Sequence, residues 1–190
     1  MKTLLISIKI FLLFMVLTGI LYPLFITGIA QLLFPSKANG SLILRDNKII
    51  GSELIGQQFD STIYFTSRPS AIGYNPLPSG GSNYGLTNSV LKQQVNKRRQ
   101  QFIQNNLLDS VTDIPAEMLF ASASGLDPHI SKQAAMLQAD RVAKAREFNE
   151  VQKQQLFSCL NNLTETPMIL GPGTEKVNVL LLNLEVDKIK

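Results

Sequence analysis

An uncharged apolar run near the N-terminus constrains this chain more than any other feature. Residues 10–34 read IFLLFMVLTGILYPLFITGIAQLLF and contain no Asp, Glu, Lys or Arg. The run is longer than the ~20 residues that a helix needs to cross the hydrocarbon core of a bilayer. Pro23 lies near its middle, and a membrane-spanning helix tolerates a proline kink better than a soluble helix does. We therefore predict a transmembrane helix over residues 10–34.

A cleaved signal peptide is the alternative interpretation of the same run. Lys2 and Lys9 would form its basic region, and GIA at residues 28–30 resembles a small-x-small cleavage site. However, the apolar core is longer than a typical signal-peptide core, and QLLF continues the apolar run beyond the cleavage point. These two features favour a retained membrane anchor.

Charge alone does not decide the orientation of this anchor, because basic residues flank it on both sides. They are Lys2 and Lys9 before the run, and Lys37, Arg45 and Lys48 after it. A long domain that follows a first span is translocated largely regardless of its charge. We therefore expect a short cytoplasmic N-terminus over residues 1–9 and one extracytoplasmic soluble domain over residues 35–190.

The 190-residue chain has few of the residue types that build metal or nucleic-acid sites. Its one cysteine, Cys159, cannot form an intramolecular disulfide, and its one histidine, His129, leaves no His/Cys cluster for zinc. The formal net charge is +4, and the one dense basic run, residues 97–99, has no aromatic residues interleaved. Such a run is typical of a solvated helix face. We therefore expect no metal site and no nucleic-acid partner.

Hydrophobic periodicity and turn residues predict a small α+β domain after the anchor. Residues 41–51 read as a β-hairpin around Asp46-Asn47, a pair that tolerates positive φ. Residues 63–65 form a short predicted strand, which must end before Pro69. Residues 74–87 are rich in Pro, Gly, Ser and Asn, and this composition predicts a loop.

Three helices and a last strand complete the predicted domain. The clearest helix start is at Asp127, an N-cap residue followed by Pro128 at the first helical position. Residues 177–186 read VNVLLLNLEV, a mostly apolar run that we interpret as a buried strand. The other elements are helices over residues 88–105 and 149–162 and a turn at GPG, residues 171–173.

The segment PSGGSNYGLTN, residues 78–88, raises the question of a nucleotide site. Its small residues precede a predicted helix, and free N–H groups at such a position can cradle a phosphate. The chain has no G-x-x-x-x-G-K-[ST] motif, and glycines in a tight turn before a helix explain SGGS without a ligand. From the residues alone we favour the tight turn. No motif marks Ser122, Ser124 or Ser131 as a nucleophile, so the sequence shows no catalytic set.

Six segments follow one another along the chain in the order of one known family. They are GSELIGQQF (residues 51–59), YFTSRPSA (64–71), YNPLPSGGSNYGLTN (74–88), SASGLDPHIS (122–131), AAMLQADRVAKAR (134–146) and VNVLLLNLEVD (177–187). With the single N-terminal span, they resemble the C subunit of the Kdp-type potassium-transporting ATPase of bacteria. SGLDPHIS and SGGSN are the most specific of these words. Leu86 departs from the family, which usually has proline there and so a stiffer loop.

The resemblance implies a non-catalytic accessory subunit of an ATP-driven, high-affinity potassium uptake complex in the bacterial cytoplasmic membrane. Its partners would be a channel-like potassium-translocating subunit, a P-type ATPase subunit that hydrolyses the ATP, and a small single-span subunit. The family is described as a catalytic chaperone that raises the ATP affinity of the ATPase subunit. The implied ligand is ATP shared with that subunit, with no cofactor of its own. A loop similar to the signature loop of ABC transporters carries the implied nucleotide contact, here Ser79, Gly80, Gly81, Ser82 and Asn83.

The predicted topology gives the polar loops a different task. A domain outside the membrane does not meet cytoplasmic ATP, so we expect these loops to contact the channel-like subunit near its outer mouth. Arg68, which precedes Pro69, is a candidate to bind an anion or a carboxylate of a neighbour. The candidate contact residues are Arg68, Asn75, Asp127, His129 and Ser131. A membrane-anchored hydrolase and an extracytoplasmic binding module are the alternatives from other functional classes.

Overall fold

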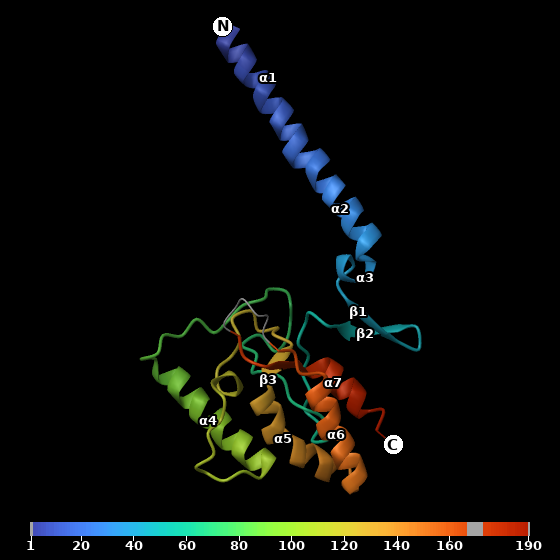
Figure 1. The fold of residues 1–190 in the computed structure, drawn as a ribbon. Coiled ribbons are helices and arrows are strands. Elements are labelled where there is room, and N and C mark those ends of the chain that lie inside the picture. The colour runs from blue at the N-terminus through green and yellow to red at the C-terminus, as the bar shows by residue number, and fades with distance from the viewer. Residues whose placement is uncertain (1, 167–172, 190) are drawn as a thin grey trace. The chain divides into compact units, whose positions relative to one another are not determined.

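The computed structural model describes residues 2–166 and 173–189 (Figure 1). They form two compact units, Met1–Ile50 and Gly51–Lys190. The first unit holds an apolar helix and most of a β-hairpin, and the second holds an α+β domain. The predicted fold class, a single N-terminal helix followed by a small α+β domain, is confirmed.

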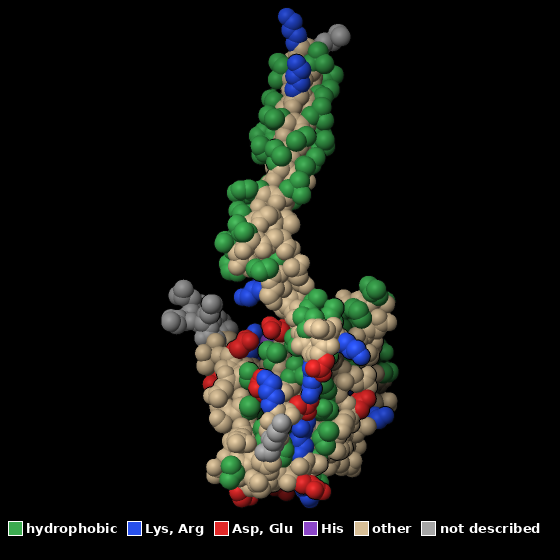
Figure 2. All heavy atoms as spheres, turned by 90° about the vertical axis from the view of Figure 1, so that its right-hand side faces the viewer, with side chains coloured by type: hydrophobic (Ala, Val, Ile, Leu, Met, Phe, Trp, Pro, Cys, Tyr) green, Lys and Arg blue, Asp and Glu red, His purple; other side chains and the backbone are tan. Residues whose placement is uncertain are grey.

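One continuous apolar helix opens the first unit. It consists of α1 (Lys2–Val16), a π-helical segment η1 (Leu17–Leu21) and α2 (Tyr22–Leu33). The mean hydropathy of its most apolar part is 2.6, and none of that part is buried within the structure. Figure 2 shows hydrophobic side chains along its visible face. By length and composition, Lys2–Leu33 is able to cross a membrane.

The π-helical segment has a local cause in Pro23. Proline has no N–H to donate, and its ring crowds the carbonyl of the residue four positions earlier, which here is Gly19. The wider turns of η1 lie directly before Pro23, and such a local π adjustment accommodates proline within a membrane helix. The helix therefore continues through the proline.

The predicted hairpin is present. Helix α3 (Pro35–Ala38) leads into β1 (Leu42–Arg45), which pairs with β2 (Lys48–Ser52). Asp46 and Asn47 have φ values of 51° and 59°, and two successive left-handed residues match the twist of the flanking strands. The short-range signal in the sequence therefore placed this turn correctly.

Helices dominate the described part of the second unit. A two-stranded sheet in it pairs residues 129–131 with residues 176–178. Its elements are α4 (Ser89–Asn106), η2 (Ala116–Met118), β3 (His129–Ser131), α5 (Lys132–Ala145), α6 (Glu150–Asn162), β4 (Lys176–Asn178) and α7 (Val179–Val186). The strands β3 and β4 are antiparallel, with Ile130 opposite Val177.

Asparagine caps start α4 and α6 where the sequence predicted helices. Asn88 Oδ1 accepts a hydrogen bond from the Val90 N–H at 2.8 Å. At α6, Asn149 Oδ1 accepts from the Gln152 N–H at 2.9 Å, and Gln152 Oε1 accepts from the Asn149 N–H at 2.8 Å. This reciprocal pair is a capping box. Both predicted helices are confirmed to within one residue at each end.

α5 is the central helix of the second unit, in contact with α4, α6 and both strands. Its buried face is mostly alanine, and small side chains at a helix contact let the partner helices approach closely. From α6, the fully buried Leu156 and Leu160 complete this part of the core. The core residues on α5 are Ala134, Ala135, Ala139, Val142 and Ala143.

The predicted last strand is wrong for most of its length. Only Lys176–Asn178 pairs as β4, and Val179–Val186 is the helix α7. Asn178 caps this helix, because its Oδ1 accepts a hydrogen bond from the Leu181 N–H at 3.2 Å. A short apolar run does not distinguish a buried helix from a buried strand. The first two positions of the predicted GPG turn lie outside the described residues.

The helix predicted to start at Asp127 starts later. Residues His129–Ser131 form β3, and α5 begins at Lys132. Its cap is Ser131, whose Oγ accepts a hydrogen bond from the Ala134 N–H at 3.0 Å. Pairing with β4, which is distant in sequence, keeps the backbone extended past the local start signal. Asp127 is therefore not the N-cap of this helix.

The predicted strand at residues 63–65 is also wrong, because the segment is irregular backbone. A side chain from α7 and one from the residue that follows α5 take the place of a neighbouring strand. Asn183 bonds to both the N–H and the carbonyl of Phe65, and Arg146 Nε donates to the Ile63 carbonyl at 2.7 Å. These partners lie 83 to 118 residues away along the chain, so no local pattern could predict them.

Candidate functional site

Four of the residues selected from the sequence meet in one cleft of the second unit, beside the strands β3 and β4. The cleft has a volume of about 570 Å³. His129 and Ser131 come from β3, Asp127 from the segment before it, and Arg68 from a much earlier loop. The other lining residues are Pro115, Glu117, Ile130, Gln133, Thr174 and Lys176.

Asp127 is the best-connected side chain of this cleft. Its Oδ2 lies 2.7 Å from Arg68 Nη1, in a charge-assisted hydrogen bond. Its Oδ1 accepts a hydrogen bond from the His129 N–H at 3.0 Å, and the imidazole Nδ1 of His129 lies 3.7 Å from the same oxygen. The carboxylate thus closes a local turn and joins it to Arg68.

The bonds at Asp127 keep its carboxylate ionised. Burial raises the pKa of Asp127, but the hydrogen bonds from His129 and the charge of Arg68 outweigh that effect and lower the pKa to about 2. At neutral pH the cleft therefore contains a fixed ion pair. A carboxylate held in this state is a poor general base, so the arrangement suits binding better than proton transfer.

Backbone packing fixes the position of the Asp127 segment. The Gly56 N–H donates a hydrogen bond to the Leu126 carbonyl at 2.7 Å. A Cβ atom at Gly56 would lie 2.6 Å from the carbonyl oxygen of Asp127, closer than van der Waals contact permits. This position therefore requires glycine. The close contact at Gly56 brings residues 51–59 next to residues 124–131.

Tyr74 makes a hydrogen bond to the backbone of Arg68. The Tyr74 hydroxyl donates to the Arg68 carbonyl at 2.5 Å, and burial raises the pKa of Tyr74 to about 12, so the phenol keeps its proton. Arg68 Nε is buried and has no hydrogen-bond partner among the described residues. The side chain of Arg68 is 25% exposed, and the carboxylate that it contacts in this structure is that of Asp127 in the same chain.

The SGGSN loop lies against the segment that leads into Asp127. The Gly80 N–H donates to the Ser124 carbonyl at 3.0 Å. A Cβ atom at Gly81 would lie 3.1 Å from the Ala123 carbonyl oxygen, a tight contact between two stretches of backbone. Close approach to this segment explains a glycine at position 81. Ser79 and Asn83 are exposed at the ends of the loop.

The N-terminus of α4 offers little to a phosphate. Asn88 Oδ1 already accepts from the N–H groups of Val90 and Leu91, at 2.8 and 3.4 Å. Any phosphate contact would therefore fall to the main chain of the SGGSN loop itself. Within the described residues, the Gly81, Ser82 and Asn83 N–H groups have no hydrogen-bond partner.

Asn75 does not join the cleft. It is exposed, and its Oδ1 accepts a hydrogen bond from the Leu77 N–H at 3.1 Å, which stabilises a local turn. Glu117 and Lys176 line the cleft but were not selected from the sequence. Glu117 Oε1 accepts from the Ser131 N–H at 3.2 Å, and no spacing in the sequence signals this contact.

The described residues contain no group of three or more His, Cys, Asp or Glu side chains that could hold a metal ion. Ser131 Oγ is engaged as a helix cap. The cleft presents the Arg68–Asp127 ion pair and further polar side chains on its lining. Together with the α+β fold, the apolar helix defines a class: proteins with one N-terminal helix able to cross a membrane, followed by a small α+β domain.

The family follows from comparison with known proteins. A family model described as "KdpC: K+-transporting ATPase, c chain" matches residues 4–188. The chain therefore belongs to the KdpC family, as the resemblance in its sequence indicated.

Several relatives are similar over nearly the whole chain. A protein of Pectobacterium atrosepticum is 49% identical over 187 residues, which cover 97% of this chain and 95% of the relative. A protein of Polynucleobacter asymbioticus is 47% identical, with 93% of each chain covered, and one of Caldanaerobacter subterraneus is 43% identical, with 95% and 92% covered. Each is named potassium-transporting ATPase KdpC subunit.

Proposed function

We propose that this chain is the non-catalytic accessory subunit of a potassium-transporting ATPase, anchored in the bacterial cytoplasmic membrane by its apolar helix. The observation that carries the proposal is the family match over residues 4–188, which includes both the helix and the α+β domain. A partner P-type ATPase subunit hydrolyses the ATP, a channel-like subunit translocates the ion, and a small single-span subunit completes the complex.

The α+β domain contacts its partners through the polar cleft and the loop that ends at α4. Large apolar side chains on this loop are exposed, with Leu77 at 82% and Leu86 at 83%. Exposed apolar groups beside polar ones are typical of protein interfaces. We assign this face to the channel-like subunit near its outer mouth, with the N-terminus cytoplasmic and the domain outside.

The family resemblance adds a role as a catalytic chaperone that raises the ATP affinity of the ATPase subunit. The main chain at Ser79, Gly80, Gly81, Ser82 and Asn83 is the candidate for any nucleotide contact. A domain outside the membrane would exert this effect through its partners, without meeting ATP directly.

Co-purification tests the proposal. Tagged full-length chain, expressed with its neighbouring transport subunits, should recover them from detergent, and its deletion should abolish growth at limiting potassium. The double variant Arg68→Gln/Asp127→Asn should lower recovery, whereas Arg99→Gln, which lies outside the cleft, should not. Recovery of the chain alone, with growth unaffected by its deletion, would rule out a subunit role.

The chaperone role needs its own measurement. The KM for ATP of the purified complex should rise when the chain is omitted, and kcat should change less. An unchanged KM would remove the chaperone role and leave assembly as the function.

A further inference from the structure

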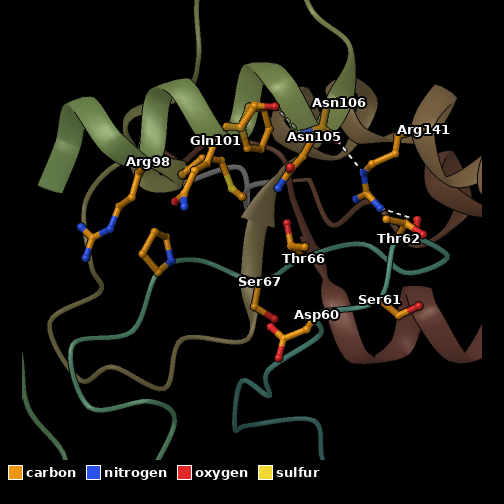
Figure 3. Close-up of a pocket in the computed structure, with 13 residues that line it drawn as sticks. Asp60, Ser61, Thr62, Thr66, Ser67, Arg98, Gln101, Asn105, Asn106 and Arg141 are labelled. Carbon is orange, nitrogen blue, oxygen red and sulfur yellow. Dashed lines mark hydrogen bonds between the residues drawn. The ribbon is translucent and has the colours of Figure 1, made fainter.

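We propose that a second pocket of the α+β domain binds a small oxyanion solute, such as a phosphate or a short carboxylate. The pocket has a volume of about 310 Å³ and lies between α4 and the segment at residues 60–69 (Figure 3). Its described lining residues include none of those that line the Asp127 cleft. The two sites are therefore separate.

The charged groups on the lining of this pocket are two arginines and one aspartate. Arg98 comes from α4, Arg141 from α5, and Asp60 from the early segment. Asp60 is exposed, and its Oδ2 accepts a hydrogen bond from Gln58 Nε2 at 2.8 Å. Two guanidinium groups against one carboxylate leave the pocket with a net positive charge.

Arg141 is a buried cation whose hydrogen-bond partners among the described residues are all neutral. It is 7% exposed, and burial lowers its pKa. Its guanidinium donates to Asn106 Oδ1 at 2.8 Å, Gln138 Oε1 at 3.1 Å, the Tyr64 carbonyl at 3.0 Å and the Thr62 carbonyl. A buried charge without an opposite charge is costly, so an anion in the adjoining pocket would stabilise this arrangement.

Arg98 supplies the free donors. The basic run at residues 97–99 is not wholly a solvated face, because Arg98 and Arg99 are half-buried. Arg98 Nη1 donates to the Leu119 carbonyl at 2.9 Å, and its other N–H groups have no partner in the described residues. Burial lowers the pKa of Arg98 below its usual value, but the group remains charged at neutral pH.

Neutral donors continue the row that Arg98 begins. Gln101 and Asn105 follow Arg98 at helical spacing on the same face of α4 and line the same pocket. In Figure 3 their side chains extend from α4 toward Thr66 and Ser67. Within the described residues, neither carboxamide has a hydrogen-bond partner. The guanidinium of Arg98 and the two carboxamides can therefore donate several hydrogen bonds to the oxygens of one phosphate or carboxylate.

A neighbouring hollow gives a solute access to Arg98. It has a volume of about 290 Å³ and shares Arg98 and Asp60 with the pocket. Arg98 therefore lies where the two hollows meet, and an anion can reach it without displacing the core.

Arg99 is a matched control for Arg98. It is the next residue of α4, is also half-buried, and its Nη2 donates to a main-chain carbonyl, that of Ser110, at 2.8 Å. It does not line the pocket. Replacing either arginine by glutamine removes one charge and one hydrogen bond to a carbonyl, but only Arg98→Gln alters the pocket.

Isothermal titration calorimetry of the full-length chain in detergent micelles tests the proposal. The probes are sodium phosphate and sodium succinate, with sodium chloride at matched ionic strength as the reference. We expect saturable binding of at least one oxyanion. Arg98→Gln should weaken it by about tenfold or more, as expected for loss of a charge-assisted hydrogen bond. Arg99→Gln should bind like the unaltered chain.

Two results would overturn the oxyanion site: heats no larger than those of chloride, or equal losses in Arg98→Gln and Arg99→Gln. If Arg98→Gln does not fold, Gln101→Leu replaces it, since this exposed residue has no structural hydrogen bond among the described residues. Binding that Gln101→Leu leaves unchanged would place the anion elsewhere and contradict the proposal.

Discussion

The side chain of Asn183 pairs with the backbone of Phe65 as a neighbouring strand would. Asn183 Oδ1 accepts from the Phe65 N–H at 2.8 Å, and its Nδ2 donates to the Phe65 carbonyl at 2.9 Å. Phe65 is fully buried and Asn183 is 2% exposed. One carboxamide on α7 therefore satisfies both polar groups of a buried residue that has no β-partner in the described chain.

Asn183→Leu should destabilise the domain by about 2–4 kcal/mol, because it leaves two buried backbone groups without a hydrogen bond. Asn162→Leu is the control, since Asn162 is an exposed helical asparagine and should change stability by less than about 0.5 kcal/mol. Urea unfolding of the full chain in detergent, followed by circular dichroism, measures both. Equal effects would mean that the Asn183–Phe65 pair adds nothing to stability.

Ser131→Ala should cost about 1 kcal/mol of stability, because Ser131 Oγ caps α5 through the Ala134 N–H. Ser89→Ala is the matched control at the start of α4, where Asn88 carries the cap and Ser89 is exposed. The same unfolding experiment distinguishes them. A Ser131→Ala variant as stable as Ser89→Ala would show that the cap lies elsewhere.

The Asp127 carboxylate should stabilise the domain in a pH-dependent way. Its pKa is lowered from 3.8 to about 2 in the folded state, so the contribution is complete above about pH 4. It disappears as the pH falls toward 2, because the folded state then takes up the proton as well. Asp127→Asn should therefore cost about 1–2 kcal/mol at pH 7 and progressively less in acid.

The pH test compares the free energy of unfolding of the unaltered chain and Asp127→Asn at pH 7 and near pH 2.5. Asp113→Asn, at an exposed aspartate with no ion pair among the described residues, controls for general acid effects. A difference between the unaltered chain and Asp127→Asn that stays constant with pH would contradict the role of the ionised carboxylate.

A cysteine at position 79 should report which side of the membrane the domain occupies. Ser79 is exposed, whereas Ser82 is half-buried, so Ser79→Cys in a Cys159→Ser background gives one accessible thiol. A membrane-impermeant maleimide should label it in intact spheroplasts, because a long domain after a first span is translocated. Lys2→Cys in the same background should be labelled only after lysis. The reverse pattern would invert the proposed topology and return the SGGSN loop to the side of cytoplasmic ATP.

Part of the candidate site could be selected from the sequence. Arg68, Asp127, His129 and Ser131 were chosen from loops and motifs, and the structure places them in one cleft. Their contacts could not be predicted, because the Arg68–Asp127 pair joins positions 59 residues apart. Glu117 was missed for the same reason.

The sequence by itself determined the elements whose causes lie within a few residues. The uncharged run produces the apolar helix, Asp46-Asn47 makes the hairpin turn, and Asn149 with Gln152 begins α6. In each case the atoms that form the structure are neighbours in the chain, so residue order alone specifies them.

Only the tertiary structure decided whether residues 179–186 became a helix and where α5 begins. The first depends on burial of an apolar segment within the domain, and the second on the pairing of β3 with the distant β4. Residues 63–65 likewise do not form the strand that their composition favours. Side chains such as that of Asn183 on α7 make hydrogen bonds to their backbone instead. Burial and long-range hydrogen bonds outweigh local propensity at these positions, because leaving a buried polar group unpaired costs more than a propensity difference.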